Sequence, residues 1–192
     1  MFIAHRINTI HELNNIPNKY GIEIDLRDSN NKIIVSHDPY TDGIEFEEYI
    51  KYYNHSFIIL NIKSEGIEYK ILEIIKKYNI KDYFFLDCSF PMIYKLNKLG
   101  EKNIAIRFSE YESIETVIKC KDMVKWVWID CFTQLPLNDK TYKIFNQLNL
   151  KICIVSPELQ EQPDKIFIYK HQISNYNIHA ICTKIYNIDK WF

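Results

Sequence analysis

Residues Ile22–Arg27 read I-E-I-D-L-R, an unbroken alternation of apolar and charged side chains. A period of two is the repeat of a β-strand, so Glu23, Asp25 and Arg27 share one face and the apolar residues share the other. Strands of a parallel sheet are usually apolar on both faces, because both faces are covered. The charged face of this strand therefore predicts a polar site that the rest of the fold encloses.

The remainder of the chain alternates between strand-like runs and segments with helical spacing. Seven further runs rich in Ile, Val, Phe, Tyr and Trp predict strands at Phe2–Arg6, Phe57–Lys63, Tyr83–Ser89, Ile104–Phe108, Trp126–Phe132, Lys151–Ser156 and Ala180–Lys184, with an extra short strand at Ile33–His37. Helical spacing of apolar residues is clear in Ile67–Tyr78, Met92–Leu99 and Tyr142–Leu150, and weaker in Glu45–Tyr53, Ile114–Lys119 and Lys165–Tyr176.

This alternation predicts the fold class. Strands that alternate with helices pair in parallel through crossover connections, and eight such units predict an α/β protein with a compact (β/α)8 TIM barrel. The chain of 192 residues is slightly short for that fold, so we expect minimal loops and a single domain spanning residues 1–192. The alternative is an open, doubly wound sheet. Its nucleotide-binding forms use glycine-rich turns, whereas this chain has four glycines and no G-x-G-x-x-G motif.

The composition limits the classes of function and partner. The formal net charge of -1 favours neither nucleic acid nor a membrane surface. No stretch approaches the ~18 apolar residues of a membrane span, and the N-terminus reads directly as a strand rather than as a leader. The five scattered cysteines contain no C-x-x-C pair, so we expect buried free thiols in a reducing compartment. These features predict a cytoplasmic protein.

Polar residues gather at the carboxyl ends of the predicted strands, where barrels of this kind build their sites. Besides the charged strand, these residues are Asn61, Lys63, Asp87, Ser89, Arg107 and Asp130. Two buried carboxylates on one strand face are costly unless a cation compensates their charge. Glu23 and Asp25 are therefore predicted oxygen ligands for one divalent cation, Mg²⁺ or Ca²⁺.

Two histidines end strands beside this carboxylate pair. His5 ends the first predicted strand and is followed by Arg6, and His37 ends the extra strand and is followed by Asp38. Cleavage of a phosphodiester needs one group that accepts a proton from the attacking hydroxyl and one that donates a proton to the leaving oxygen. Imidazole serves both roles near neutral pH. The two histidines are thus candidate catalytic residues.

Three motifs occur in order over the first third of the chain: H-R at residues 5–6, G-I-E-I-D at 21–25 and V-S-H-D-P at 35–39. Their order and spacing resemble the glycerophosphodiester phosphodiesterase family and, more broadly, the phosphatidylinositol-phospholipase-C-like superfamily. Leu60–Lys63 is similar to the family's third-strand segment, and Ser89-Phe90 is similar to its S-F after the fourth strand. The resemblance is diffuse over the rest of the chain.

The resemblance implies a metal-dependent hydrolase that acts on a small-molecule phosphodiester. His5 and His37 would be the general acid and base, while Arg6 and Lys63 would contact the substrate phosphate. Family members often form a cyclic phosphate by attack of a neighbouring substrate hydroxyl, or use water directly. The third metal carboxylate of the family corresponds to Asn61, whose amide oxygen can coordinate but carries no charge. We therefore expect weaker metal binding.

Other departures from the family pattern leave alternatives open. Glu65 would supply the third carboxylate if its loop bends inward, and Lys184 stands where the family usually has an aspartate. These changes put a glycerol-type substrate in question. One alternative is a barrel that binds phosphate esters with impaired catalysis. Another is a metal-independent phosphodiester lyase, in which Arg6, Lys63 or Lys184 replaces the charge of the cation.

Overall fold

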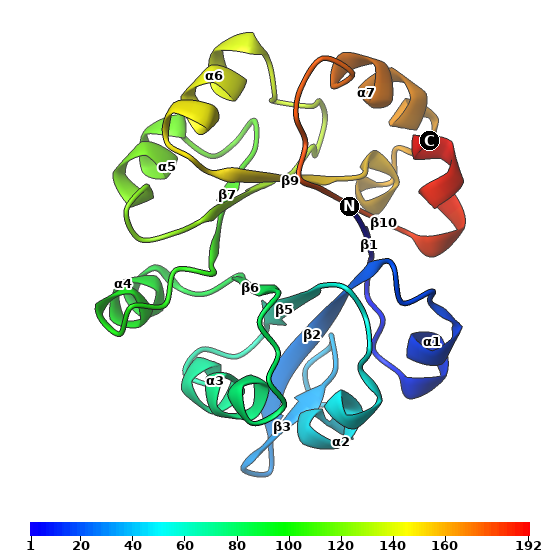
Figure 1. The fold of residues 1–192 in the computed structure, drawn as a ribbon, viewed down its shortest axis with the longest axis vertical. Helices are drawn as coiled ribbons and strands as arrows, with labels where there is room; N and C mark the ends of the chain where they lie inside the picture. Colours follow the sequence, from blue (N-terminus) through cyan, green and yellow to red (C-terminus); the bar gives the residue numbers. More distant parts are fainter.

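A computed structural model describes residues 1–192 as a mixed α/β protein built on a ten-stranded sheet. Eight strands form its parallel part: β1 (Phe2–Ala4), β2 (Gly21–Ser29), β5 (Ile58–Ile62), β6 (Tyr83–Leu86), β7 (Ala105–Phe108), β8 (Trp126–Ile129), β9 (Lys151–Val155) and β10 (Ala180–Thr183). Each overlaps one of the eight predicted strands. Figure 1 shows them around the centre of the molecule, with the helices outside.

The order of the parallel strands follows one continuous path through the sheet. Parallel ladders join β6 to β5, β5 to β2, β2 to β1, β1 to β10, and so on through β9 and β8 to β7. The first strand therefore pairs with the last one, which an open doubly wound sheet would not require. Between β6 and β7 the only pairing is the isolated parallel bridge Phe85–Ile104.

A short antiparallel extension leaves the parallel part at β2. The strand β3 (Lys32–Val35) pairs with the end of β2, and β4 (Ile44–Glu45) pairs with β3. The extra strand was predicted at this place, whereas β4 was not, because two residues carry no periodicity. The loop between β3 and β4 holds His37, whose backbone carbonyl accepts a hydrogen bond from Arg27 of β2. This extension therefore brings the second histidine toward the end of β2.

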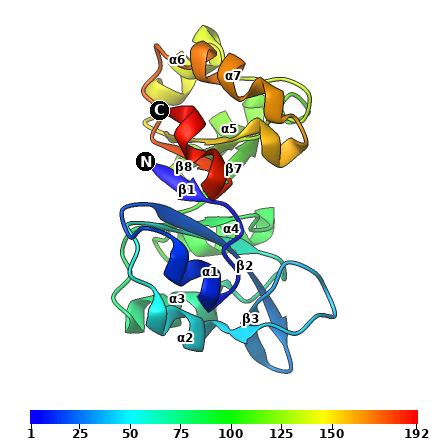
Figure 2. The ribbon, with the colours of Figure 1, turned by 90° about the vertical axis from the view of Figure 1, so that its right-hand side faces the viewer.

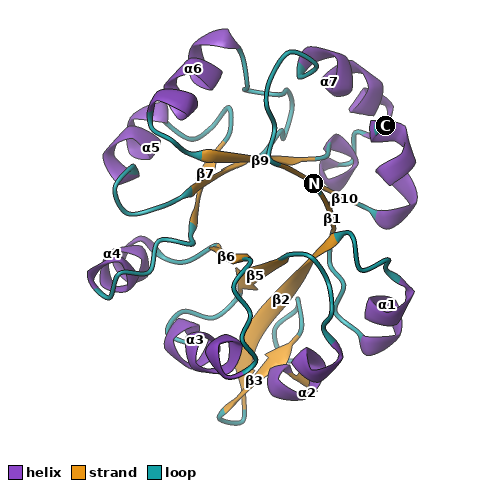
Figure 3. Cartoon of the chain, in the orientation of Figure 1, coloured by secondary structure: helices purple, strands orange, loops and turns teal.

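The helices surround the strands, as Figures 2 and 3 show. They are α1 (Ile10–Asn15), α2 (Phe46–Tyr49), α3 (Glu68–Lys77), α4 (Phe90–Lys98), α5 (Ile114–Cys120), α6 (Asp139–Gln147) and α7 (Ile166–Gln172), with short 3-10 helices at Ile50–Tyr52, Pro157–Gln160, Pro163–Lys165 and Ile185–Trp191. The sequence missed α1, in which Leu13 is the only buried residue. Its start is defined instead by a capping box between Thr9 and Glu12. None of the helices has the length and apolar character needed to cross a membrane.

Two hydrophobic clusters divide the interior. A cluster of 12 buried residues, including Ile59, Phe84 and Trp126, packs on the inner face of the sheet, and the ring centroids of Phe84 and Trp126 lie 4.9 Å apart. A cluster of 40 buried residues lies between strands and helices. Neighbours in sequence go to different clusters, because alternate side chains of a strand point to opposite faces. Leu60, for example, belongs to the outer cluster and Ile59 to the inner one.

The same alternation confirms the interpretation of the charged strand. The apolar residues of Ile22–Arg27 all belong to the outer cluster, whereas Glu23 and Asp25 are buried on the inner face. Most of the predicted strands end one to three residues earlier in the structure. After β1 and β6 the backbone turns left-handed, at Arg6 (φ 57°) and at Asp87 (φ 61°). Both residues lie at the carboxyl ends of strands and present their side chains to the candidate site.

Candidate active site

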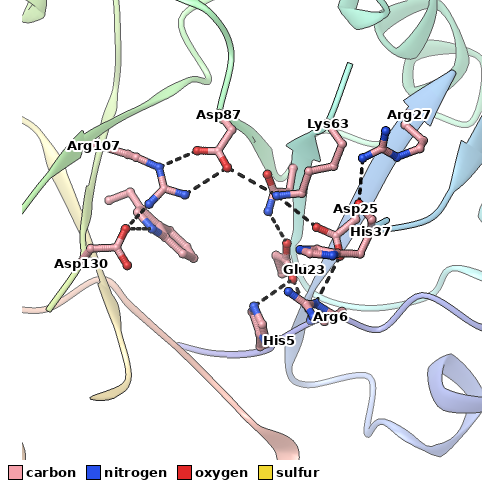
Figure 4. A network of polar contacts seen from close by, with 12 residues as sticks. His5, Arg6, Glu23, Asp25, Arg27, His37, Lys63, Asp87, Arg107 and Asp130 are labelled. Carbon is pink, nitrogen blue, oxygen red and sulfur yellow. Dashed lines mark hydrogen bonds and ion pairs between the residues drawn. The ribbon is translucent and has the colours of Figure 1, made fainter. Parts of the chain in front are cut away.

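The candidate site forms where β1, β2, β5 and β6 end, and Figure 4 shows its polar contacts. The predicted residues His5, Arg6, Glu23, Asp25 and Lys63 are connected there by the hydrogen bonds and ion pairs described below. Neighbouring parallel strands explain this grouping. Asp25 of β2 lies opposite Asn61 of β5 in the strand register, so the charged faces of the two strands meet.

Glu23 is fully buried and is held through both carboxylate oxygens. The backbone N–H of Arg6 donates to Oε2 at 2.7 Å, and the side-chain amide of Asn61 donates to Oε1 at 2.8 Å. Burial, together with the negative charge of Asp25, raises the pKa of Glu23 to about 7, against the effect of these two hydrogen bonds. The carboxyl group therefore changes its charge near neutral pH.

Asp25 is also buried, but it lies among more positive charge. Its Oδ1 lies 3.4 Å from the Lys63 ammonium and its Oδ2 lies 3.6 Å from Nε of Arg6. The side chain of Asn8 donates to Oδ2 at 2.8 Å and accepts from the Asp25 backbone N–H at 3.0 Å. Asn8 was not among the predicted site residues, because no pattern distinguishes it from other loop asparagines.

His5 lies beside Glu23, with 3.8 Å between Nε2 and Oε2. Its side chain is 17% exposed, and its Nδ1 is buried without a hydrogen-bond partner. Burial lowers the pKa of His5 to about 3, and the positive charges of Lys184, Arg6 and Lys63 contribute to this shift. The imidazole is therefore neutral at pH 7.

His37 is the more exposed of the two histidines, with 37% of its side chain accessible. Its Nδ1 lies 2.7 Å from Oδ1 of Asp38, and its backbone carbonyl accepts a hydrogen bond of 2.8 Å from Arg27. Figure 4 shows His37 on the same side of the site as Asp25 and Arg6. The contact with Asp38 leaves Nε2 as the ring atom available to a substrate.

The donor atoms around the carboxylate pair are oxygens, the ligand type that a hard divalent cation binds. Oδ1 of Asn61 is buried and has no hydrogen-bond partner, while the amide nitrogen of the same residue contacts Glu23. Burial and the charge of Asp25 raise the pKa of Glu23, and a bound cation would offset both effects. No group of three or more His, Cys, Asp or Glu side chains has the arrangement needed to hold a metal ion. The donor set is thus one carboxylate short.

Glu65 and Lys184, which the sequence offered as further site residues, lie apart from Glu23 and Asp25. Glu65 is exposed and accepts a hydrogen bond of 2.6 Å from the Ser89 hydroxyl, so its carboxylate is engaged by the loop after β6. Lys184 lines an open groove next to His5 and Arg6, with a volume of about 440 Å³. The groove adjoins the candidate site and extends between α1 and the last 3-10 helix of the chain.

A second group of charged residues lies at the ends of β6, β7 and β8. Arg107 donates to both oxygens of Asp87 and also contacts Asp130, and Lys63 links this group to Asp25 (Figure 4). The sequence placed these residues at strand ends without assigning them a role. Gln160, which donates to Asp130 at 3.0 Å, had no sequence signal, because it lies in a short 3-10 helix.

Solved structures of glycerophosphodiester phosphodiesterases share the fold that carries this site. A glycerophosphoryl diester phosphodiesterase from Parabacteroides distasonis ATCC 8503 has a TM-score of 0.68 and 11% sequence identity, over 100% of this chain and 85% of its own. A glycerophosphodiester phosphodiesterase structure from the same organism has a TM-score of 0.68 and 15% identity, over 96% of this chain and 92% of its own. The chain therefore has the fold of these enzymes.

Comparison of sequences alone finds no relative, since no protein-family model and no curated protein match the chain. The family whose motifs the sequence resembles is nevertheless the one whose fold the structure shares. The motifs cover about the first third of the chain, whereas the shared fold covers all of it.

Proposed function

We propose that this protein is a single-domain phosphodiester hydrolase of the glycerophosphodiester phosphodiesterase type, built on a closed (β/α)8 barrel. One observation carries the proposal: the buried pair Glu23 and Asp25 contacts His5, Arg6 and Lys63 at one end of the strands. This combination of carboxylates, imidazole and cationic side chains suits cleavage of an anionic diester. The shared fold supports the same reaction class.

In this mechanism the two histidines move the protons. His5 is neutral at pH 7 and accepts the proton of the attacking hydroxyl, which belongs to water or to the substrate itself. His37, with Nε2 free, donates a proton to the leaving oxygen as the bond from phosphorus to that oxygen breaks. One proton is taken up and one is given. If a substrate hydroxyl attacks, hydrolysis of the cyclic phosphate reverses both transfers; if water attacks, exchange of protons with solvent returns both residues to their starting states.

Arg6 and Lys63 supply positive charge for the non-bridging phosphate oxygens. Both lie next to Asp25, which holds them at the site. Glu23, Asp25 and the amide oxygen of Asn61 are the residues that would hold a divalent cation, Mg²⁺ or Ca²⁺. When bound, such an ion would add charge stabilisation to the phosphoryl oxygens.

Hydrolysis of glycerophosphodiesters and of an activated aryl diester, with Mg²⁺, Ca²⁺ or EDTA, tests this proposal. His5→Ala and His37→Ala should each lower the rate by ~10²–10⁴-fold, the range for losing one acid–base group. His171→Ala is the matched control, because His171 is exposed on α7 and lies outside the site. Unchanged activity in both site variants would exclude the assigned roles.

A metal-independent lyase is the second candidate, and the contacts of Asp25 favour considering it. Lys63 and Arg6 already lie within 3.6 Å of this carboxylate, and the site lacks a third carboxylate. Such an enzyme would release a cyclic phosphate and keep its full rate in EDTA. Phosphorus NMR of the first product, with and without EDTA, distinguishes the two candidates.

A further inference from the structure

Lys63 lies between two carboxylates, one in β2 and one directly after β6. Its ammonium is 3.4 Å from Oδ1 of Asp25 and 3.5 Å from Oδ2 of Asp87, and its side chain is 19% exposed. Asp25 is shared with Arg6 and Asn8, as described above. Asp87 has no role in the proposed mechanism, yet it provides the other contact of the lysine (Figure 4).

Asp87 is itself held firmly by Arg107. The guanidinium donates from Nε to Oδ1 at 2.6 Å and from Nη2 to Oδ2 at 3.0 Å, the two-point geometry that an arginine forms with a carboxylate. These contacts outweigh burial and lower the pKa of Asp87, so it is ionised at neutral pH. Its left-handed backbone, with φ at 61°, directs this side chain from the end of β6.

Arg107 is fixed in turn by the neighbouring strand. Its Nη1 donates to Oδ2 of Asp130, which also accepts a hydrogen bond of 3.0 Å from the indole N–H of Trp128. The side-chain amide of Gln160 donates to the other oxygen of Asp130 at 3.0 Å. These contacts hold the Arg107 guanidinium in place independently of Lys63. Asp87 is therefore held by groups at the ends of β7 and β8.

We propose that Asp87 is the positioning residue that keeps the Lys63 ammonium at the phosphate site, with Arg107 as its support. Lysine is a point charge on a flexible stem, and confining it costs side-chain entropy. One carboxylate leaves the ammonium free to move around that single contact. Two carboxylates, Asp25 in β2 and Asp87 directly after β6, hold the ammonium between them. This inference rests on the proposed function only in assigning Lys63 to the phosphate.

The consequence is specific, because Asp87 acts through Lys63 and not on the substrate. Removing its charge should weaken phosphate binding only while the lysine is present. A structural role in holding β6 and β7 together would instead have the same effect with or without Lys63. A double-mutant cycle separates these outcomes.

The test uses inorganic phosphate and isothermal calorimetry, followed by diester hydrolysis. Asp87→Asn keeps the size of the side chain and tolerates the left-handed backbone. It should weaken phosphate binding and lower kcat/KM by about tenfold, which is within the usual range of coupling between contacting residues. In a Lys63→Met background the same substitution should change either quantity by less than about twofold. Asp28→Asn is the charge-matched control, since Asp28 is exposed at the end of β2 and forms no ion pair.

Equal losses in the two backgrounds would overturn the proposal, and so would an unchanged affinity in Asp87→Asn. Arg107→Lys provides a second variant that keeps the charge but loses the two-point contact. It should weaken phosphate binding by a smaller factor, again only when Lys63 is present. Phosphate binding that follows this pattern without any diester hydrolysis would remove the proposed function and leave the positioning role standing.

Discussion

Glu23→Gln should stabilise the protein, by an amount that depends on pH. The pKa of Glu23 rises from 4.5 to about 7 on folding, because burial and Asp25 disfavour its charged form. Between these two pH values the folded protein holds a proton that the unfolded chain releases, so stability from this group falls as the pH rises. A shift of this size corresponds to roughly 3 kcal/mol at pH 8 and to less than about 1 kcal/mol at pH 5.

The glutamine can keep the local hydrogen bonds. Its carbonyl oxygen accepts from the Arg6 N–H, and its amide nitrogen faces Asn61, whose own amide can turn so that the unpartnered Oδ1 accepts. The variant therefore removes a buried negative charge at little other cost. Because roughly 1 kcal/mol shifts the melting temperature of a protein of this size by about 2–4 °C, the gain at pH 8 should be about 6–12 °C.

Urea unfolding of both proteins at pH 5 and pH 8 in EDTA measures the difference directly. Comparing variant with parent at each pH cancels the contributions of titrating groups that do not interact with Glu23, and it leaves those of Glu23 and of its coupling to Asp25. A difference in unfolding free energy that is the same at the two pH values would refute the assignment of a raised pKa to Glu23. A variant that is less stable than its parent at pH 8 would refute it more strongly.

Three further substitutions test neighbouring features. Asn61→Asp should tighten Mg²⁺ or Ca²⁺ binding by about tenfold or more in calorimetry, since affinity follows the charge of the ligands, and should lower the melting temperature in EDTA. His5→Asn should reduce the loss of unfolding free energy on acidification. The pKa of His5 is lowered to about 3 in the folded protein, so the folded state loses stability as the pH falls below 6.5. Urea unfolding at a series of acidic pH values would show no difference between variant and parent if His5 is charged when folded. Gly43→Ala would place a Cβ 2.5 Å from the Val35 carbonyl oxygen, in the loop that carries His37, and should cost about 1–3 kcal/mol in thermal unfolding; an unchanged melting temperature would contradict this close approach.

The strand pattern was predictable because it depends on local alternation. Ile22–Arg27 identified both the enclosed site and the outward apolar face, and the two separate hydrophobic clusters follow from the same period. The helix α1 and the strand β4 were not predictable, because their stability comes from a capping box and from pairing with β3. Such contacts leave no periodic trace in a short segment.

The residues of the candidate site were predictable from the sequence, but the contacts between them were not. Motifs identified His5, Glu23 and His37, yet nothing in the sequence indicates that Lys63 reaches Asp87 as well as Asp25. That contact arises because β5 and β6 are adjacent strands whose ends lie side by side. The link between Arg107 and Asp130 has the same origin, since residues more than 20 positions apart meet only through strand pairing.

The proposed mechanism assigns proton acceptance to His5 and proton donation to His37. The most direct test varies the leaving group of the substrate. Rates for a glycerophosphodiester and for an activated aryl diester should be compared between the parent protein and His37→Ala. An aryl leaving group needs no proton, so the variant should lose ~10²–10⁴-fold with the glycerophosphodiester and far less with the aryl diester. His5→Ala should lose activity with both substrates. Equal losses for the two substrates in His37→Ala, or no loss in either variant, would contradict the account.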